Sequence, residues 1–362
     1  MIIIIGAGVV GASLAFQLAR AGVPVKVIDA GRIAGGTSAS SFAWVNSHDK
    51  TPRIYHDLNV AGMHAHRTLR SQFAAAPWWH EGGTIEWRAG DPARYRQKIA
   101  DLQSWGYVAQ WLDPHQLREL APDLNQAAVG DAPVAFFPEE AWIDPVVYSH
   151  YLLTDAREHG AQVVTHQAVI EIRQQGHKVV GLRTADGTLH DADIVVNCTG
   201  RYADQAAIPP ILRIPMTPTA GLLLFTPPLA HGLRQILYTP QVHIRPDGAG
   251  RLLICRNELE VAADAQFHAR SPEVLALLAA AREVLPLLRD VEPEVLRVGV
   301  RAIPADQLPA IGPSPGIGGY YSAITHSGVT LAPYIAELIV DEIVHQRPRL
   351  ELTPFRPQRF FV

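Results

Sequence analysis

The sequence predicts an α/β fold organised around a parallel β-sheet, and its first thirty residues carry most of this prediction. Residues 2–5 are all isoleucine, which is typical of a strand buried on both faces of a parallel sheet. A G-x-G-x-x-G motif follows at residues 6–11, and an apolar helical stripe runs from there to a break at Gly22. A second apolar strand, residues 23–28, ends at Asp29. This order of strand, glycine turn, helix and strand predicts the βαβ unit of a dinucleotide-binding domain.

Each part of this unit has a physical role. Gly6 permits the tight turn, Gly8 lets a pyrophosphate approach the backbone, and Gly11 lets the helix pack closely on the strand. The free N–H groups and the positive dipole end of the helix face the phosphates. Asp29 is placed to accept hydrogen bonds from an adenosine ribose, and its carboxylate repels a 2′-phosphate. The unit therefore favours FAD or NAD over NADP, and by itself leaves FAD and NAD open.

Composition narrows the class of protein. Of the 362 residues, 48% are hydrophobic and 18% charged, and the net charge of −4 gives no reason to expect a nucleic-acid partner. No apolar run reaches the roughly eighteen residues of a membrane span, so we predict no transmembrane segment. The apolar start lacks a basic region, so we expect no cleaved signal peptide. Two cysteines, Cys198 and Cys255, favour a reducing, cytoplasmic setting, and histidines without H-x-x-x-H pairing predict no metal site.

A loop rich in glycine and hydroxyl side chains, residues 31–41, follows the βαβ unit and leads into Phe42 and Trp44. It is either a flexible surface loop or a loop folded over a cofactor, and the aromatic pair favours the second. Beyond it we predict a helix at 58–73 and a strand at 82–87. Any of the histidines in this region could be catalytic, although a structural role is the stronger interpretation for each; they are His48, His64, His66 and His80.

The middle of the chain alternates between strands and helices. We predict a helix from Asp144 to His159 and a strand at 163–172. A hairpin pattern follows, in which residues 179–184 and 193–197 flank a turn at Asp186-Gly187. We predict a second hairpin, in which residues 242–246 pair with 251–255. A helix is expected at 271–288, with proline at its first position. A strand at 319–324 and a helix at 331–345 are expected near the end of the sequence. Elements of the nucleotide-binding domain therefore lie at both ends of the sequence, with insertions between them.

The sequence resembles the family of FAD-dependent amine and amino-acid oxidases that includes D-amino-acid, glycine and sarcosine oxidases. The resemblance covers nearly the full length and is strongest at residues 6–29, 36–41, 193–200 and 299–333. The last segment is the most specific, because Arg301, residues 309–312 and a Ser-Gly-x-Thr-Leu-Ala-Pro run occur in the family's order. The resemblance implies a Rossmann-type FAD-binding domain (1–47, 145–205 and 299–362) with an inserted antiparallel-sheet α+β substrate domain (48–144 and 206–298).

The resemblance also implies which residues hold FAD. Those expected at the adenosine diphosphate are Gly6, Ala7, Gly8, Val9, Val10, Gly11, Asp29, Ala30 and Arg32. Those expected along the ribityl chain and flavin ring are Thr37, Ser38, Ser40, Ser41, Phe42, Ala43, Trp44 and Val45. Val169 would contact the adenine, and Thr199 and Gly200 would pass close to the cofactor. The start of the last helix would place N–H groups by the flavin pyrimidine; its residues there are Ser327, Gly328, Val329 and Thr330. We expect non-covalent binding, because the tail has no cysteine and the 36–46 loop no histidine.

Arg301 stands where members of this family grip the substrate carboxylate, for which a guanidinium fork is suited. The alternative is an arginine paired with an acid at the domain interface. The sequence departs from the family here, with Ala302 where proline is usual and Asp306-Gln307 where Asp-Gly is common. His326, expected near the flavin edge, and His243, on a hairpin strand, are candidates for substrate binding or proton transfer.

The resemblance implies oxidation of the C–N bond of an amino acid or related secondary amine to an imine, by hydride transfer to flavin N5, followed by hydrolysis. O₂ or another acceptor would reoxidise the flavin. Two alternatives stay open: a nicotinamide-dependent dehydrogenase with the same opening motif, and a non-catalytic flavin-binding subunit of an electron-transfer complex. The sequence does not specify the amine, its stereochemistry or the oligomeric state.

Overall fold

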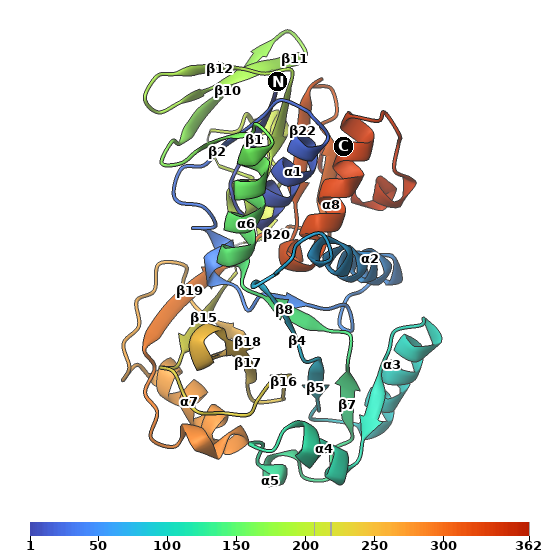
Figure 1. Cartoon of the computed structure of the whole chain (residues 1–362), viewed down its shortest axis with the longest axis vertical. Helices are drawn as coiled ribbons and strands as arrows, with labels where there is room; N and C mark the ends of the chain where they lie inside the picture. The colour runs from blue at the N-terminus through green and yellow to red at the C-terminus, as the bar shows by residue number, and fades with distance from the viewer. Residues whose placement is uncertain (206, 218, 362) are drawn as a thin grey trace.

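The computed structural model describes residues 1–205, 207–217 and 219–361. Two lobes, each with its own large β-sheet, lie one above the other in Figure 1, and both termini are in the upper lobe. The upper sheet has the order β21 (Ala310–Pro313), β22 (Tyr320–Ile324), β13 (Ile194–Asn197), β1 (Ile2–Ile5), β2 (Val25–Ile28) and β9 (Gln162–Val164). Its neighbours pair in parallel, except for the antiparallel edge strand β21.

The two faces of β1 are covered by different elements, because successive side chains of a strand point to opposite faces. Ile2 and Ile4 belong to a core cluster with the helices α1 (Val9–Arg20), α6 (Pro145–Glu158) and α8 (Gly328–Ile343). Ile3 and Ile5 pack instead with an outer sheet formed by β10 (Val169–Gln175), β11 (Lys178–Thr184) and β12 (Leu189–Asp191). This two-sided burial explains why the strand is apolar at every position.

Helix α2 (Arg53–Arg70) packs across the start of α8. The helices approach closely at Gly62, where an added Cβ would lie 2.5 Å from the carbonyl oxygen of Thr330. Glycine at this position therefore lets α2 support the first turn of α8.

The lower lobe contains an eight-stranded sheet. Its order is β19 (Val295–Val300), β15 (Ala220–Phe225), β18 (Arg251–Glu260), β17 (His243–Asp247), β16 (Ile236–Tyr238), β5 (Thr84–Glu86), β7 (Val134–Phe137) and β6 (Gln110–Leu112). All neighbours are antiparallel except β16 and β5. The helices of this lobe are α3 (Pro92–Ser104), α4 (Pro114–Leu120), α5 (Gln126–Val129) and α7 (Pro272–Val284), and α7 joins a core cluster with the sheet.

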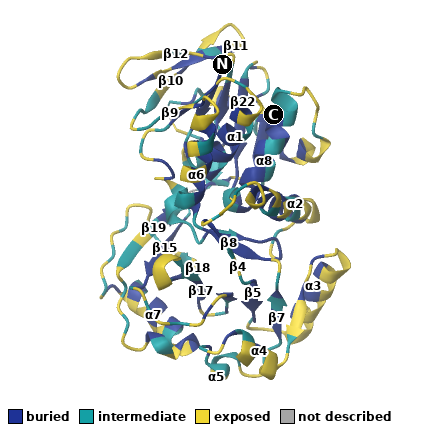
Figure 2. Ribbon diagram, in the orientation of Figure 1, coloured by how far each residue is buried: buried dark blue, intermediate teal, exposed yellow. Residues whose placement is uncertain are grey.

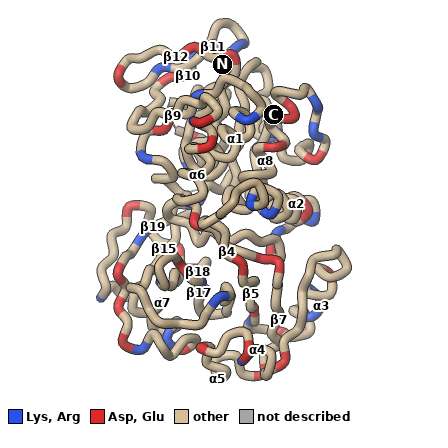
Figure 3. The backbone as a smooth tube through the Cα atoms, viewed as in Figure 1, with Lys and Arg blue, Asp and Glu red and all other residues tan. Residues whose placement is uncertain are grey.

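Small sheets connect the lobes. One joins β3 (Trp44–Val45), β8 (Ala141–Ile143) and β4 (Trp79–Glu81), and the other joins β14 (Met216–Thr217) to β20 (Ile303–Pro304). Short 3₁₀ turns occupy Thr37–Ser40, Gly200–Tyr202, Pro210–Leu212, Gly248–Gly250, Pro286–Leu288, Leu350–Phe355 and Pro357–Phe360. Figure 2 shows buried positions along the strands of both sheets, and Figure 3 shows that acidic and basic residues are interspersed over both lobes.

The predicted α/β fold is confirmed, including the opening βαβ unit, the second hairpin and the C-terminal helix. Helix α8 begins at Gly328, three residues before the expected start, so that Ser327 is its N-cap. Helix α2 covers Arg53–Arg70 rather than 58–73, since Pro52 in extended conformation precedes its first turn. Helix α7 ends at Val284, shortly before Pro286. The domain boundaries stay a prediction, and the one at residue 206 falls outside the described residues.

Two strand predictions were wrong. The strand expected at 163–172 is two strands in different sheets, because the chain bends at His166, whose φ is +58°. The first hairpin closes on β12 rather than on 193–197, since the Asp186-Gly187 turn returns the chain at Leu189. Strand β13 lies instead between β1 and β22 in the parallel sheet.

Candidate cofactor and active site

Two cavities run from the βαβ unit into the space between the lobes. The first cavity, of about 650 Å³, is lined at the carboxyl ends of the parallel strands by residues that include Gly6, Gly8, Asp29 and Thr199. The second cavity, of about 210 Å³, is lined by the segment after the βαβ unit, by strands of the lower sheet and by the start of α8. Thr37 lines both cavities, so they adjoin. The carboxyl ends of parallel strands are where open α/β sheets bind ligands.

The glycines of the opening motif lie where a side chain does not fit. Gly6 has a φ of +107°, and a Cβ there would lie 2.5 Å from the carbonyl oxygen of Cys198. A Cβ on Gly11 would lie 1.9 Å from the carbonyl oxygen of Gly6, because α1 starts directly against the turn. Helix α1 begins after Gly8, which lacks a side-chain cap, and Gly8 lines the first cavity. The N–H of Val9 donates to the Ser38 hydroxyl at 3.2 Å, and the following N–H groups of the first turn face the cleft without a side-chain cap, which fits a pyrophosphate.

Asp29 is held at the end of β2 by two backbone donors. The N–H of Ala7 donates to its Oδ2 and the N–H of Gly31 to its Oδ1, each at 2.7 Å. The carboxylate lines the first cavity together with Val169, expected at the adenine. Each carboxylate oxygen keeps a further lone pair for a ribose hydroxyl. These features fit the adenosine end of a dinucleotide.

The loop after the βαβ unit joins the two cavities. Thr37 donates to the carbonyl oxygen of Val300 at 2.8 Å, so the loop is tied to β19. Gly299 permits this approach, since a Cβ there would lie 2.2 Å from the carbonyl oxygen of Ser40. Further along, the Thr330 hydroxyl donates to the carbonyl oxygen of Trp44 at 3.1 Å. The expected cofactor loop is thus packed and hydrogen-bonded, and the alternative of a flexible surface loop does not describe it.

Arg301 follows β19, is half-buried and lines the second cavity. Its Nη2 donates to the carbonyl oxygen of Asn257 at 3.0 Å. Within the described part of the chain no acid lies at ion-pair distance from Arg301, so the alternative of an acid partner at the domain interface is not found there. A guanidinium with one backbone partner retains donors for a carboxylate.

Two histidines line the second cavity. His243 is only 3% exposed and stacks on Tyr238, with ring centroids 4.0 Å apart. Neither of its ring nitrogens has a hydrogen-bond partner among the described residues. Burial, with the charge of Arg88, lowers the pKa of His243 to about 3, so the ring is neutral near pH 7.

His326 precedes the N-cap of α8 and opens onto the same cavity. The surrounding protein lowers the pKa of His326 by displacing water, and the charges of Lys50 and Arg301 lower it further. A neutral imidazole accepts or donates a hydrogen bond without adding charge to the site.

A network of six charged side chains, which we call the charge network, lies behind Trp44. It contains His48, Asp49, Glu86, Arg88, Lys98 and Glu140. His48 is buried, with Nδ1 2.6 Å from Oε1 of Glu140 and Nε2 3.5 Å from Oδ2 of Asp49. Burial alone would lower the pKa of His48, but the carboxylates of Glu140, Glu86 and Asp49 outweigh it and raise the pKa to about 9. Three carboxylates therefore face three cations.

The charge network positions the wall of the second cavity. Trp44 Nε1 donates to Oε2 of Glu140 at 3.0 Å and to the hydroxyl of Thr84 at 3.1 Å. The ligand atoms of His48, Asp49 and Glu86 lie within 4.8 Å of one another, as in metal sites. Arg88 and Lys98 already bind both carboxylates, however, so the donor set fits an ion-pair network and does not fit a metal ion.

The two cavities collect most of the site residues predicted from sequence. The first is lined by Gly6, Gly8, Asp29, Ala30, Arg32, Thr37, Ser38, Val169, Thr199 and Gly200. The second is lined by Thr37, Ser40, Ser41, Phe42, Ala43, Trp44, His243, Arg301, His326, Ser327, Val329 and Thr330. The predicted residues outside both linings are Ala7, Val9, Val10, Gly11, Val45 and Gly328. Among these, Val9 donates its N–H to the Ser38 hydroxyl at 3.2 Å, and Val45 is buried in the core.

The sequence analysis missed several residues that line the second cavity. They are Asp49, Lys50, Tyr238, Arg256 and Asn257. Only Asp49 and Lys50 had a sequence signal, since a charged pair directly follows the loop expected over the cofactor. The other three come from strand β16 and β18, and nothing in their local pattern predicts that they face the loop.

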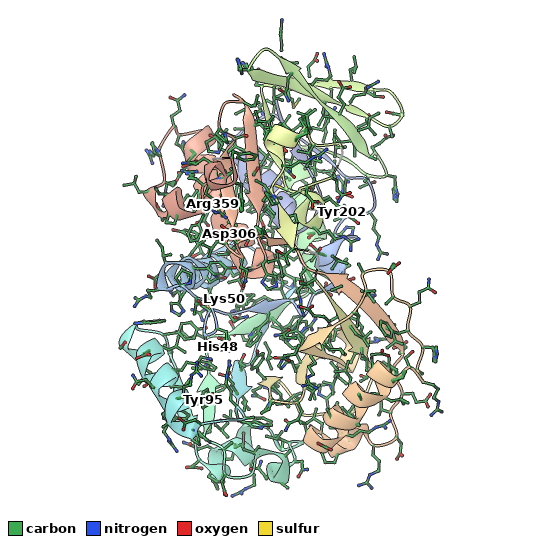
Figure 4. The ribbon with its side chains drawn as sticks, turned by 180° about the vertical axis from the view of Figure 1, so that it is seen from behind. His48, Lys50, Tyr95, Tyr202, Asp306 and Arg359 are labelled. Carbon is green, nitrogen blue, oxygen red and sulfur yellow. The ribbon has the colours of Figure 1, made fainter. Side chains whose placement is uncertain are left out.

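The departures from the family pattern after Arg301 also have structural consequences. Asp306 forms a two-contact ion pair with Arg359, at 2.5 and 3.1 Å, and Figure 4 labels both residues on the same side of the upper lobe. Gln307 has a φ of +67°, a conformation that glycine adopts more readily than glutamine. The backbone turn at residue 307 would therefore form with less steric cost if glycine stood there, as in the common Asp-Gly pair.

Comparisons with known proteins agree with this geometry. The chain is 25% identical over 405 residues to hydrogen cyanide synthase subunit HcnC of Pseudomonas aeruginosa, covering 99% of this chain and 96% of that protein. It is 23% identical over 368 residues to a glycine oxidase of Bacillus licheniformis, covering 99% and 96%. A crystal structure of glycine oxidase from Geobacillus kaustophilus matches the fold with a TM-score of 0.88 at 22% identity, covering 99% of this chain and 98% of that one.

The opening motif alone left FAD and NAD open. A family model described as FAD dependent oxidoreductase, DAO, matches residues 1–342, which include both cavities. This match identifies the dinucleotide as FAD and excludes the nicotinamide-dependent alternative. The chain belongs to the DAO family of FAD-dependent oxidoreductases.

Proposed function

We propose that this oxidoreductase converts the C–N bond of an amino acid or related secondary amine to an imine, which water then hydrolyses. The observation that carries the proposal is Arg301, a cavity-lining guanidinium with no acid partner among the residues that the structure describes. Its cavity adjoins the one that fits a dinucleotide. The glycine oxidase named above supports an amino-acid substrate.

FAD is proposed to bind without a covalent bond, with its adenosine diphosphate in the first cavity and its ring in the second. Bound there, it supplies the two-electron acceptor for a hydride from the substrate. Cys198 lines the first cavity and Cys255 lines the second, and burial raises the pKa of both thiols. The non-covalent assignment is supported because neither supplies the thiolate that a bond to the flavin would need.

The residues of the second cavity are proposed to bind and orient the substrate. Arg301 would hold the carboxylate of the substrate. The C–H bond to be broken would then be fixed relative to the flavin ring. The neutral rings of His243 and His326 would accept or donate hydrogen bonds, which favours the uncharged amine. Ser327 is the N-cap of α8, but its side chain accepts no hydrogen bond from the first turn of the helix. That turn also contains no acidic residue. Its N–H groups would stabilise negative charge that develops nearby, by about 0.3–1 kcal/mol.

Anaerobic absorption spectroscopy tests this function. The yellow holoenzyme should lose its visible absorption when mixed with pooled D- and L-amino acids and N-methyl amino acids, but not with simple amines. Arg301→Ala should bleach at least tenfold more slowly at the same substrate concentration, while Arg289→Ala, an exposed arginine, should behave like the unaltered protein. Yellow protein that no amine bleaches would contradict the proposal.

A second candidate comes from the relative that is named a subunit of hydrogen cyanide synthase. That name favours a chain that acts within a larger assembly. Purification of the untagged protein from its own cells, followed by mass measurement under native conditions, tests this. A second chain in stoichiometric amount would favour the assembly, and a single kind of chain that bleaches with amino acids would favour the independent enzyme.

The electron acceptor and the cytoplasmic location stay predictions. No helix in the described ranges is both long enough and apolar enough to cross a membrane.

A further inference from the structure

The second cavity carries unequal positive and negative charge. Its charged lining residues are Asp49, Lys50, Arg256 and Arg301. The carboxylate of Asp49 is compensated, since it pairs with Arg88 and, at 2.6 Å, with Lys98. Arg256 has a neighbouring acid, with its Nε 3.7 Å from Oε2 of Glu258.

Lys50 and Arg301 have no comparable compensation. Within residues 1–205, 207–217 and 219–361 neither forms an ion pair, and the guanidinium of Arg301 donates to an uncharged carbonyl group. Both charges lower the pKa of His326, after the larger effect of displaced water. Lys50 and Arg301 line the same cavity as His326, although they come from distant parts of the sequence. Figure 4 labels Lys50 at the waist between the lobes, just above His48.

Two uncompensated cations that line one cavity repel each other, and their repulsion is screened less in a partly enclosed cavity than in water. A substrate with one carboxylate compensates one of them. A second anionic group on the substrate would compensate the other, through charge-assisted hydrogen bonds to the ammonium. His243 is neutral near pH 7, so it adds no third positive charge to the cavity.

We propose that Lys50 is a specificity-determining residue that binds a second carboxylate of the substrate, so that this enzyme prefers amino and imino dicarboxylic acids to amino acids with one carboxylate. The proposal rests on the proposed function. It assigns to Lys50 a role that is separate from that of Arg301, which binds the carboxylate common to all amino-acid substrates.

Matched substrate pairs test this preference. Iminodiacetate differs from sarcosine by one added carboxylate, and aspartate differs from alanine in the same way. For each pair, with both enantiomers of the chiral acids, kcat/KM is obtained from the anaerobic rate of flavin bleaching at varied substrate concentration. At least one diacid should exceed its matched monoacid by about ten- to hundredfold, the contribution of one charge-assisted hydrogen bond.

Variants assign the preference to the ammonium. Lys50→Met should lower kcat/KM for the preferred diacid by about ten- to hundredfold and leave the monoacid within about twofold. Lys50→Arg should retain most of the preference, because it keeps the charge. Lys178→Met removes an exposed lysine of β11, outside both cavities, and should change neither value.

A binding measurement keeps this inference separable from the proposed function. Acetate and malonate are titrated into the oxidised holoenzyme, and the shift of the flavin spectrum gives Kd for each. Malonate should bind at least tenfold more tightly than acetate, and Lys50→Met should abolish the difference. If no amine bleaches the flavin, the proposed function fails while this titration still tests the cation pair. If monoacids bleach the flavin as fast as diacids and Lys50→Met changes neither rate nor malonate binding, the role of Lys50 is overturned and the proposed function stands.

Discussion

The imidazole of His48 donates from Nδ1 to the carboxylate of Glu140 across 2.6 Å, and both side chains are buried. The same carboxylate accepts hydrogen bonds from Tyr107 at 2.6 Å and from Trp44 at 3.0 Å. A tryptophan on the wall of the second cavity is thus oriented by a charged pair in the lower lobe. This coupling links the stability of the charge network to the shape of the site.

The His48–Glu140 pair predicts a pH-dependent stability. The pKa of His48 is about 9 in the folded protein and about 6.5 when unfolded. Because the folded value is the higher one, the stabilisation is fully present below about pH 6.5, falls as pH rises toward 9, and is lost above it. The change amounts to roughly 3 kcal/mol. Urea unfolding at pH 6 and pH 9.5 measures it.

His48→Phe provides the comparison for this pH dependence. The variant should be destabilised by about 3–5 kcal/mol at pH 6, because Glu140 keeps a buried charge without its partner. It should also lose most of the decline in stability between pH 6 and 9.5. His64→Phe removes an exposed histidine of α2 and should keep the decline. An unchanged decline in His48→Phe would contradict the assignment.

Gly11→Ala should disrupt the start of α1. A Cβ would meet the carbonyl oxygen of Gly6 at 1.9 Å, so helix and turn must separate and the N–H groups at the first cavity must shift. We expect the purified variant to lose most of its FAD and its unfolding free energy to fall by about 1–3 kcal/mol. Absorbance at 450 nm per protein and thermal unfolding measure the two effects. Gly248→Ala, where nothing lies within 4 Å, should retain FAD, and equal FAD content in both variants would contradict this reading of Gly11.

Asp29→Ala should weaken FAD binding by about tenfold or more, the contribution of one hydrogen bond to a charged acceptor. The loss also frees the N–H groups of Ala7 and Gly31, both bound to the carboxylate at 2.7 Å. Asp29→Asn keeps one oxygen acceptor, so its Kd for FAD should lie between those of the unaltered protein and Asp29→Ala. Fluorescence titration of the apoprotein with FAD gives Kd, and an Asp29→Ala value equal to the original would remove Asp29 from the adenosine site.

Both cysteines should be inert in the folded protein. Cys198 and Cys255 are unpaired and buried, and burial raises the pKa of both thiols, that of Cys255 to about 12. Thiolate is the reactive form, so a thiol reagent at pH 8 should label neither residue in minutes. Two thiols per chain should react after unfolding in urea. Rapid labelling of the native protein would contradict this expectation.

The sequence by itself determined the features that depend on near neighbours. The βαβ unit of residues 1–29 is recognisable because apolar period, glycine turn and terminal acid are all local properties. The second hairpin was predicted for the same reason, and the structure confirms it. Arg301 and His326 were found through a short motif near the end of the chain, and both line the second cavity.

Only the tertiary structure decided which distant segments meet. The pattern at 163–172 carries no sign that the chain leaves one sheet and enters another at His166, since its strand partners come from other parts of the chain. The charge network likewise joins residues 48–49, 86–88, 98 and 140, each of which reads as an ordinary surface charge in its own segment. Lys50 and Arg301 likewise line one cavity only in the folded chain, since about 250 residues separate them in the sequence. Local patterns specify elements, whereas long-range packing and register specify their neighbours, and the charges of a site depend on those neighbours.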